Sequence, residues 1–150
     1  MRNILVPVDF SDATPAVVEA AVDLARAINA KLHLVHVDAT DSVDVGYDLN
    51  AKPGREELAR VLRAEHRSLL ELEEALKAQG LEVRGALLRD NIVDGILREA
   101  ERVDPYLIVI GSHGHGALRR LLLGGVSTGV LRRAGRLVVV VPVQGNSAGD

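Results

Sequence analysis

The segment from Asn3 to Val8 reads NILVPV and decides the fold class, because it is a short run of mostly branched apolar residues. Such a run is typical of a strand buried on both faces of a parallel sheet. The next segment, Thr14 to Ala30, repeats its apolar residues at helical spacing and predicts an amphipathic helix packed on that strand. The N-cap of this helix is expected at Ser11, Asp12 or Thr14, whose side chains accept hydrogen bonds from main-chain amides.

The same alternation of strand and helix continues along the chain. Further strands are expected at residues 32–37, 82–88, 106–110 and 137–141, and further helices at about 54–79, 92–102 and 125–134. Strands that alternate with helices form right-handed crossovers and a parallel sheet covered on both faces. The sequence therefore predicts one doubly wound α/β domain over residues 1–143, with four main helices and a five-stranded parallel sheet in the order 3-2-1-4-5. Residues 144–150 are expected to form a flexible C-terminal tail.

Composition and charge narrow the classes of function. The 150 residues include 18 Lys and Arg against 21 Asp and Glu, a net charge of −3, and only three aromatic residues. Nucleic-acid binding needs a concentrated positive field and rings that stack on bases, so it is not expected. The absence of cysteine excludes disulfides, thiolate zinc sites and cysteine nucleophiles. Neither a signal peptide nor a membrane-spanning run is evident, so a cytoplasmic location without membrane association is expected.

A ligand is expected where the order of the strands reverses, between the first and fourth strands. The first strand ends at Pro7, Val8 and Asp9, and the fourth ends in the segment from Ile110 to Gly114, which includes Ser112 and His113. Gly124, Gly125, Val126 and Ser127 open the last helix. Glycines allow close approach to the backbone, and a helix N-terminus presents unpaired amides with a partial positive charge. Together these features favour a phosphate site. The alternative is that the glycines only shape a loop and a helix start.

The sequence lacks the signatures of other phosphate-binding folds. No GxxxxGK[ST] run is present, and no GxGxxG follows the first strand, which argues against a P-loop NTPase and a dinucleotide site. A two-component receiver would place an Asp at the end of the third strand and a Lys after the fifth. Here the third strand ends at Leu87-Leu88-Arg89, and no Lys follows Lys77.

Four segments of the chain read NILVPVDFS at 3–11, IVIGSHG at 108–114, LLLGGVS at 121–127 and VVVVP at 138–142. With these segments the chain resembles the universal stress protein family over residues 2 to 142. The ATP-binding pattern of that family is G-x2-G-x9-G-[ST]. Gly111, Gly114 and Gly124 match its three glycines in register.

The resemblance implies a flavodoxin-like fold and an adenine-nucleotide site with ATP, AMP or ADP, and Mg²⁺ near Asp9. Asp9 would lie by the ribose and any bound metal, with Pro7 and Val8 on the same wall, and the backbone of Val37 would meet the adenine edge. Ile110, Gly111 and Gly114 would pass beneath the ribose and α-phosphate, with Ser112 and His113 in the same loop. Gly124, Gly125, Val126 and Ser127 would cradle the outer phosphates.

Two positions depart from the family pattern. Gly125 stands where the family usually has Ser or Thr, so one hydroxyl that would face phosphate is missing. A neutral hydrogen bond contributes about 0.5–1.5 kcal/mol, so weakened rather than abolished binding is expected. Asp90-Asn91-Ile92 replaces a Gly-x-Pro turn that the family often has at the binding edge. Asp90 is expected to cap the third helix rather than to repel phosphate.

Other polar residues receive plainer interpretations. His113 and His115 form an H-x-H pair, but no third metal ligand is evident, so they are expected at the surface or at the edge of the ligand. His33 and His36 are expected to be ordinary sheet residues. The last strand would lie at the edge of the sheet, and its apolar composition favours pairing with a second copy. A homodimer through residues 137–142 is therefore expected.

The sequence thus predicts a nucleotide-binding, stress-response regulatory protein with no dedicated catalytic residues and at most slow ATP hydrolysis. The alternative is a dimeric interaction scaffold of the same fold that binds no nucleotide, which Gly125 and Asp90 favour. A third class, the related adenine-nucleotide hydrolases, would need an SGGxDS-type loop after the first strand. Val8-Asp9-Phe10-Ser11-Asp12 does not supply one.

Overall fold

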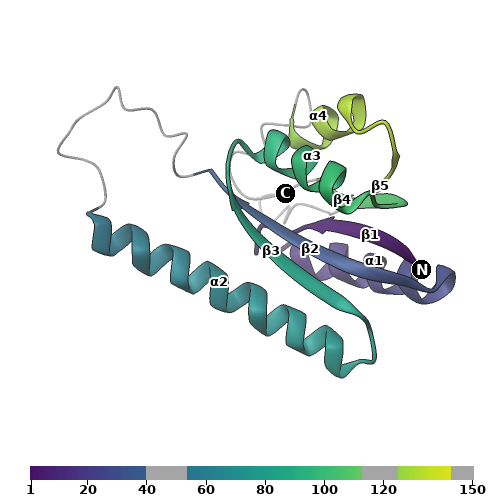
Figure 1. The fold of residues 1–150 in the computed structure, drawn as a ribbon, viewed down its shortest axis with the longest axis horizontal. Helices are drawn as coiled ribbons and strands as arrows, with labels where there is room; N and C mark the ends of the chain where they lie inside the picture. Colours follow the sequence, from purple (N-terminus) through teal and green to yellow (C-terminus); the bar gives the residue numbers. More distant parts are fainter. Residues whose placement is uncertain (40–53, 113–124, 143–150) are drawn as a thin grey trace, which may run out of the picture.

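The computed structural model describes residues 1–39, 54–112 and 125–142. Its strands are β1 (Arg2–Pro7), β2 (Ala30–Asp38), β3 (Val83–Arg89), β4 (Leu107–Gly111) and β5 (Leu137–Val141). Its helices are α1 (Thr14–Ile28), α2 (Arg55–Ala78), α3 (Ile92–Val103) and α4 (Val126–Arg133). The strands form one parallel sheet in the order β3-β2-β1-β4-β5 (Figure 1), which confirms the predicted fold class.

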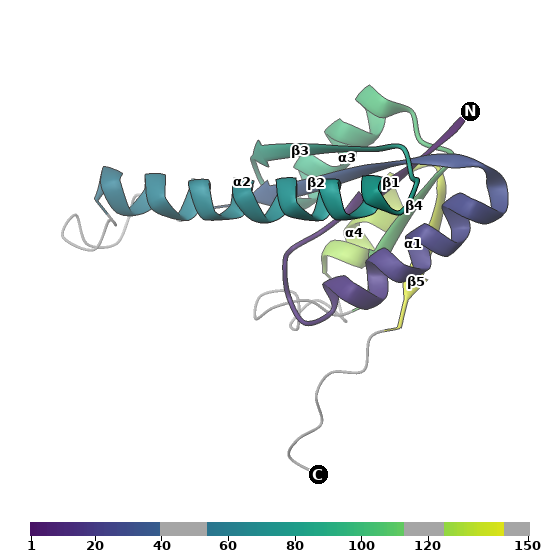
Figure 2. The same cartoon turned by 90° about the horizontal axis from the view of Figure 1, so that it is seen from below.

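Two hydrophobic cores lie on opposite faces of this sheet. Helices α1 and α2 cover one face, and α3 and α4 cover the other (Figures 1 and 2). The central strand β1 supplies both cores, because successive side chains of a strand point to opposite faces. Ile4 and Val6 are fully buried on the α1 side, while Leu5 is fully buried on the α3 side. This double covering explains why the β1 segment is a continuous apolar run.

The structure corrects the predicted boundary between the first helix and the second strand. Asn29 adopts a left-handed conformation with φ 51°, which ends α1 at Ile28, so Ala30 belongs to β2 rather than to the helix. The predicted side-chain N-caps of α1 are also wrong. Ala13 occupies that position, and no side chain caps the helix.

Asp90 does not cap the third helix, contrary to the prediction. The neighbouring Asn91 is the N-cap, and its side chain accepts the Asp94 amide at 3.3 Å. Asp90 instead pairs with Arg98 on the outside of α3 at 2.8 Å. By contrast, Gly80 follows the end of α2 with φ 85°, as predicted for a glycine just beyond a helix C-terminus.

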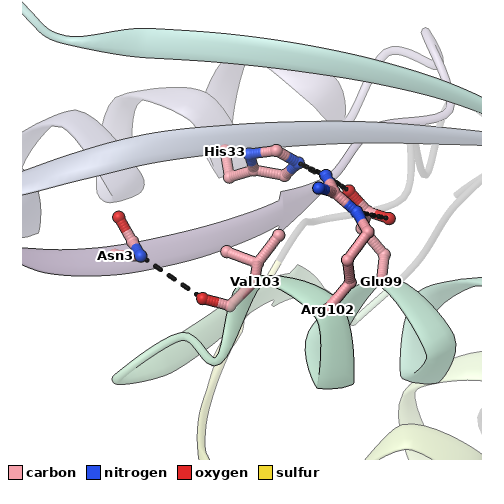
Figure 3. Close-up of polar contacts among 5 residues, drawn as sticks. All are labelled: Asn3, His33, Glu99, Arg102 and Val103. Carbon is pink, nitrogen blue, oxygen red and sulfur yellow. Dashed lines mark hydrogen bonds and ion pairs between the residues drawn. The ribbon is translucent and has the colours of Figure 1, made fainter.

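A polar cluster fastens the C-terminal half of α3 to the sheet (Figure 3). The carboxylate of Glu99, only 3% exposed, lies 2.7 Å from Nε2 of His33 and accepts a hydrogen bond from Nε of Arg102 at 3.0 Å. The hydrogen bonds from Arg102 lower the pKa of Glu99. Burial of the carboxyl opposes this shift, and His33 adds to it. Next to this cluster the side chain of Asn3 donates to the carbonyl of Val103 at 3.3 Å. His33 is therefore more than the ordinary sheet residue that the sequence predicted.

Two surfaces of the fold carry exposed apolar residues. Strand β5 is an edge strand as predicted, and Leu137 and Val140 are exposed on it. Helix α2 extends past the sheet at its N-terminal end (Figure 1), and its buried residues, Leu69 and Leu76, lie in the C-terminal half. Among the described residues no helix combines the length and the apolar character needed to cross a bilayer.

Candidate functional site

A pocket lies at the carboxyl ends of β1, β2 and β4, where the order of the strands reverses. The first turns of α1, α3 and α4 complete its walls. Its lining is mostly apolar and contains one ionisable side chain, Asp9, among the described residues. The lining residues are Pro7, Val8, Asp9, Ala13, Thr14, Val17, Val35, Val37, Ile92, Ile96, Ile110, Gly111, Ser112, Val126 and Ser127. This is the position at which open α/β sheets bind their ligands.

The pocket brings together most of the site residues that the sequence singled out. Nine of them line it: Pro7, Val8, Asp9, Val37, Ile110, Gly111, Ser112, Val126 and Ser127. Gly125 lies just outside the lining, as the N-cap of α4. His113, Gly114 and Gly124 lie outside the described residues, as do His115 and most of the loop that joins β4 to α4.

The turn after β1 orients the carboxylate of Asp9. Its Oδ1 accepts the Ser11 amide at 3.0 Å and the Thr14 hydroxyl at 3.3 Å. The next residue, Phe10, adopts a left-handed conformation with φ 57°, which is uncommon for a bulky side chain. The surrounding structure must stabilise this backbone, so the turn presents Asp9 to the pocket in one orientation.

The end of β2 offers main-chain groups to the pocket. The carbonyl of Val35 accepts the Val8 amide at 2.8 Å, so it points toward β1. Main-chain groups of a strand alternate in direction, which places the N–H and C=O of Val37 on the same side, where β1 has already ended at Pro7. These two groups therefore face the crevice.

A glycine allows α3 to approach this wall closely. A Cβ atom at Gly95 would lie 2.8 Å from Cγ1 of Val37, which real side chains do not tolerate. The close contact brings the first turn of α3, with Ile92 and Ile96, against the pocket. Gly95 thus sets the width of the crevice on this side.

The start of α4 forms the part of the pocket wall that favours an anion. Gly125 is extended and, within the described residues, no side chain caps the amides of the first turn. Val126 and Ser127 from this turn line the pocket. A helix N-terminus also carries about half a positive charge, and an anion placed there is stabilised by both features.

Sequence analysis missed the residues that the helices contribute: Ala13, Thr14, Val17, Ile92 and Ile96, together with Val35. Part of the signal was present. All helices of a parallel sheet begin at the carboxyl ends of strands, so Thr14 and Ile92, the first residues of α1 and α3, were candidates by topology alone. Among the described residues no group of three His, Cys, Asp or Glu side chains is arranged to hold a metal ion.

Comparison with known proteins agrees with this architecture. The family model described as the universal stress protein family matches residues 1–142. The chain belongs to the universal stress protein family. A universal stress protein of Methanocaldococcus jannaschii is 27% identical over 143 residues, covering 93% of this chain and 81% of the relative. The solved structure of universal stress protein UspA from Lactobacillus plantarum matches with a TM-score of 0.76 at 26% identity, covering 93% of this chain and 97% of that chain.

Two solved universal stress proteins contain adenine nucleotides. One, in complex with cAMP, has a TM-score of 0.68 and 23% identity, with 94% of this chain and 96% of that chain covered. The other, from Archaeoglobus fulgidus in complex with dAMP, has a TM-score of 0.64 and 22% identity, with 94% and 98% covered. At these identities the likeness establishes the shared fold, and the nucleotides are properties of those two proteins.

Proposed function

We propose that this universal stress protein binds an adenine nucleotide in the pocket at the carboxyl ends of β1, β2 and β4, and that it acts as a regulatory protein. The observation that carries the proposal is the pocket itself. Among the described residues it combines apolar walls, the end of β2 at Val37, one carboxylate and a helix N-terminus that no side chain caps. The nucleotides held by two solved relatives support the choice of ligand.

The apolar part of the pocket suits a purine base. Val37, Ile92 and Ile96 form a wall against which a flat ring would be desolvated. The N–H and C=O of Val37 supply one donor and one acceptor toward the crevice, the pair that the edge of adenine needs. We therefore assign the base to the β2 side of the pocket.

The phosphates are assigned to the start of α4. The amides of Val126 and Ser127 belong to the uncapped first turn, and the Ser127 hydroxyl adds a further donor. Gly125 contributes no hydroxyl, and the missing hydrogen bond corresponds to at most about tenfold in affinity. His113, Gly114 and Gly124 belong to the same proposal through their sequence motif.

Asp9 is the residue that would hold Mg²⁺ carried by a nucleotide. Magnesium in nucleotide sites is bound by one or two carboxylates together with the phosphates, and Asp9 is the only carboxylate that lines the described pocket.

Fast hydrolysis is not proposed. Asp9 already accepts two hydrogen bonds through Oδ1, and the described lining contains no second acid or base to activate water. ATP, ADP and AMP are all ligands under this proposal, with slow ATP turnover at most.

A homodimer through β5 also belongs to the proposal. Leu137 and Val140 are exposed on this edge strand, and an exposed apolar edge invites pairing with a second copy.

The competing function is a dimeric scaffold that binds no nucleotide. The pairing of Asp90 with Arg98 weakens that alternative, because it compensates the charge that would repel phosphate at the edge of the site.

Two matched variants on α4 test the site. Ser127→Asp and Thr128→Asp both place a carboxylate in the first turn of the helix, where it favours helix formation by about 0.3–1 kcal/mol. Only Ser127 lines the pocket, so only Ser127→Asp should weaken AMP binding, by about tenfold or more through like-charge repulsion. Adenosine, which has no phosphate, should bind both variants and the parent chain alike. Calorimetric titration of the parent chain with AMP, ATP and adenosine measures these affinities.

Three results of that titration would count against the proposal. No heat with millimolar AMP or ATP in the parent chain would remove the nucleotide and favour the scaffold. Equal loss of AMP affinity in Ser127→Asp and Thr128→Asp would show a general effect of charge on the helix. Loss of adenosine binding together with AMP binding in Ser127→Asp would place the base, rather than the phosphate, at α4.

A further inference from the structure

A buried histidine lies directly behind the pocket without lining it. His36 is on β2, is 7% exposed, and faces the α1 and α2 side of the sheet. Its Nδ1 lies 2.7 Å from the carbonyl oxygen of Val8. A carbonyl only accepts hydrogen bonds, so Nδ1 must carry a proton and donate it. This fixes the tautomer of the ring and leaves Nε2 to face the other way.

The ring of His36 contacts the residues on both sides of Asp9. Val8 precedes Asp9 and receives the hydrogen bond, and Phe10 follows it, with ring centroids 5.0 Å from His36 and planes tilted by 47°. The Val8 carbonyl belongs to chain that has left β1, and Phe10 is the residue with φ 57°. Backbone in that conformation persists only where its surroundings hold it, and the His36 ring is one of the groups that contact it.

The other edge of the ring meets helix α2. Nε2 of His36 lies 3.4 Å from Oε2 of Glu65, and within the described residues neither atom has a hydrogen bond to any other group. Burial raises the pKa of the Glu65 carboxyl, His36 opposes the rise, and Asp38, the last residue of β2, adds to it. The ring therefore connects α2 to the turn after β1.

We propose that His36 is a positioning residue for the pocket: it fixes the backbone on both sides of Asp9 and joins that backbone to helix α2 through Glu65. Its role for a bound ligand rests on the proposed nucleotide site, but its role in holding the turn does not. Asp9 then depends on His36 for its place through the backbone of Val8 and Phe10 on either side of it. In the sequence, only the position of His36 directly before Val37 sets it apart.

The test compares substitutions that keep or remove the Nδ1 donor. In His36→Asn the amide nitrogen reaches the place of Nδ1, in His36→Gln it reaches the place of Nε2, and His36→Leu has no donor. His33→Leu is the matched control, because it removes a histidine from the same strand but from the opposite face, where it contacts Glu99. The control loses stability without touching the turn after β1.

The first readout needs no ligand. The amide of Ser11 donates to Asp9, so its hydrogen exchange reports the order of the turn. Relative to the amides of β1, exchange at Ser11 should be about tenfold faster in His36→Leu and His36→Gln. It should be slower in His36→Asn, which keeps the donor to Val8, than in His36→Gln, and close to the parent rate in His33→Leu. Unchanged exchange in His36→Leu, or equally fast exchange in His36→Asn and His36→Gln, would overturn the proposal.

The second readout is AMP affinity by calorimetry. His36→Gln should weaken AMP binding by about tenfold, while His36→Asn and His33→Leu should stay within about threefold of the parent chain. Should His36→Leu fail to fold, the pair of His36→Asn and His36→Gln still decides the outcome. A parent chain that binds no nucleotide would defeat the proposed function and leave the exchange test intact. Equal weakening by His33→Leu and His36→Gln would reduce His36 to a general contribution to stability.

Discussion

The two histidines of β2 lie in opposite halves of the strand and on opposite faces of the sheet, and their surroundings differ. His33 points to α3 and lies 2.7 Å from a Glu99 carboxylate that Arg102 also contacts. His36 points to α2, donates to a main-chain carbonyl and lies 3.4 Å from Glu65, whose pKa is affected by burial, His36 and Asp38. The pKa of Glu99 is lowered, chiefly by Arg102, and that of Glu65 is raised, chiefly by burial. At the His33 end, the half of β2 nearer its start, the Glu99 carboxylate has two partners. At the His36 end, the half beside the pocket, the facing atoms of His36 and Glu65 lie 3.4 Å apart without a hydrogen bond among the described residues.

This contrast agrees with the place at which parallel α/β folds bind their ligands. Ligands of open α/β sheets bind at the carboxyl ends of the strands, and His36 is nearer that end of β2 than His33 is. Substitutions at the two ends should therefore separate stability from binding.

The largest expected effect on stability is at the His33 end. Glu99→Ala removes a buried carboxylate and leaves His33 and Arg102 without the acceptor between them, so the free energy of unfolding should fall by about 2 kcal/mol. AMP affinity should not change. Glu101→Ala on the exposed side of the same helix is the control and should change stability by less than about 0.5 kcal/mol. Urea unfolding at pH 7 measures both, and a loss for Glu99→Ala as small as that of the control would contradict the comparison.

A smaller loss of stability, coupled to binding, is expected at the pocket end. Gly95→Ala would place a Cβ 2.8 Å from Val37, so α3 or the pocket wall must shift at a cost of about 1–2 kcal/mol. AMP affinity should fall with it, because Val37 and Ile92 line the pocket. In Gly129→Ala the new Cβ would lie 3.2 Å from the Val93 side chain, and the gain in helix propensity offsets the contact. Full AMP affinity in Gly95→Ala would show that the width of the crevice is not set there.

The smallest expected effects are changes of folding stability with pH. They have opposite signs for Glu99 and Glu65. The folded-state pKa of Glu99 lies below its ordinary value of 4.5, so its stabilisation is full above that pH and is lost as pH falls through the folded pKa. Glu99→Gln should therefore be less stable than the parent chain at pH 7, and the gap should close as the solution is acidified below pH 4.5.

For Glu65 the sign is reversed. Its folded-state pKa lies above 4.5, so the contribution is fully present below that pH and is lost as pH rises through the folded pKa. Relative to the parent chain, Glu65→Gln should gain stability as pH rises, within about 1 kcal/mol. Unfolding free energies of both variants between pH 3 and pH 8 measure this, and parallel curves for the two would contradict the contrast between the clusters.

Much of the fold was predictable because it depends on local patterns. The apolar run at residues 3–8, the helical spacing that follows and the glycine at position 80 each carry their structural consequence in a few neighbouring residues. The errors lie where two local solutions compete. Asn29 ends a helix as readily as it continues one, and Asp90 and Asn91 are both good N-caps, so packing and the partner Arg98 decided between them.

The pocket was predictable as a place rather than as a full set of residues. Topology directed the ends of β1 and β4 to one crevice, and nine of the residues singled out line it. The contacts of His33 and His36 were not predictable, because Glu99 lies 66 positions and the Val8 carbonyl 28 positions away along the chain. Periodicity within β2 indicates which face a histidine occupies but not which groups meet it there.

The most direct test of the account is to map AMP onto the backbone amides of the parent chain by heteronuclear NMR. The proposed site predicts that the largest shifts fall on Val8, Asp9, Val37, Ser112, Val126 and Ser127, with the amides around His33 and Glu99 unmoved. Shifts centred on the His33 end, or an unchanged spectrum at millimolar AMP, would contradict it.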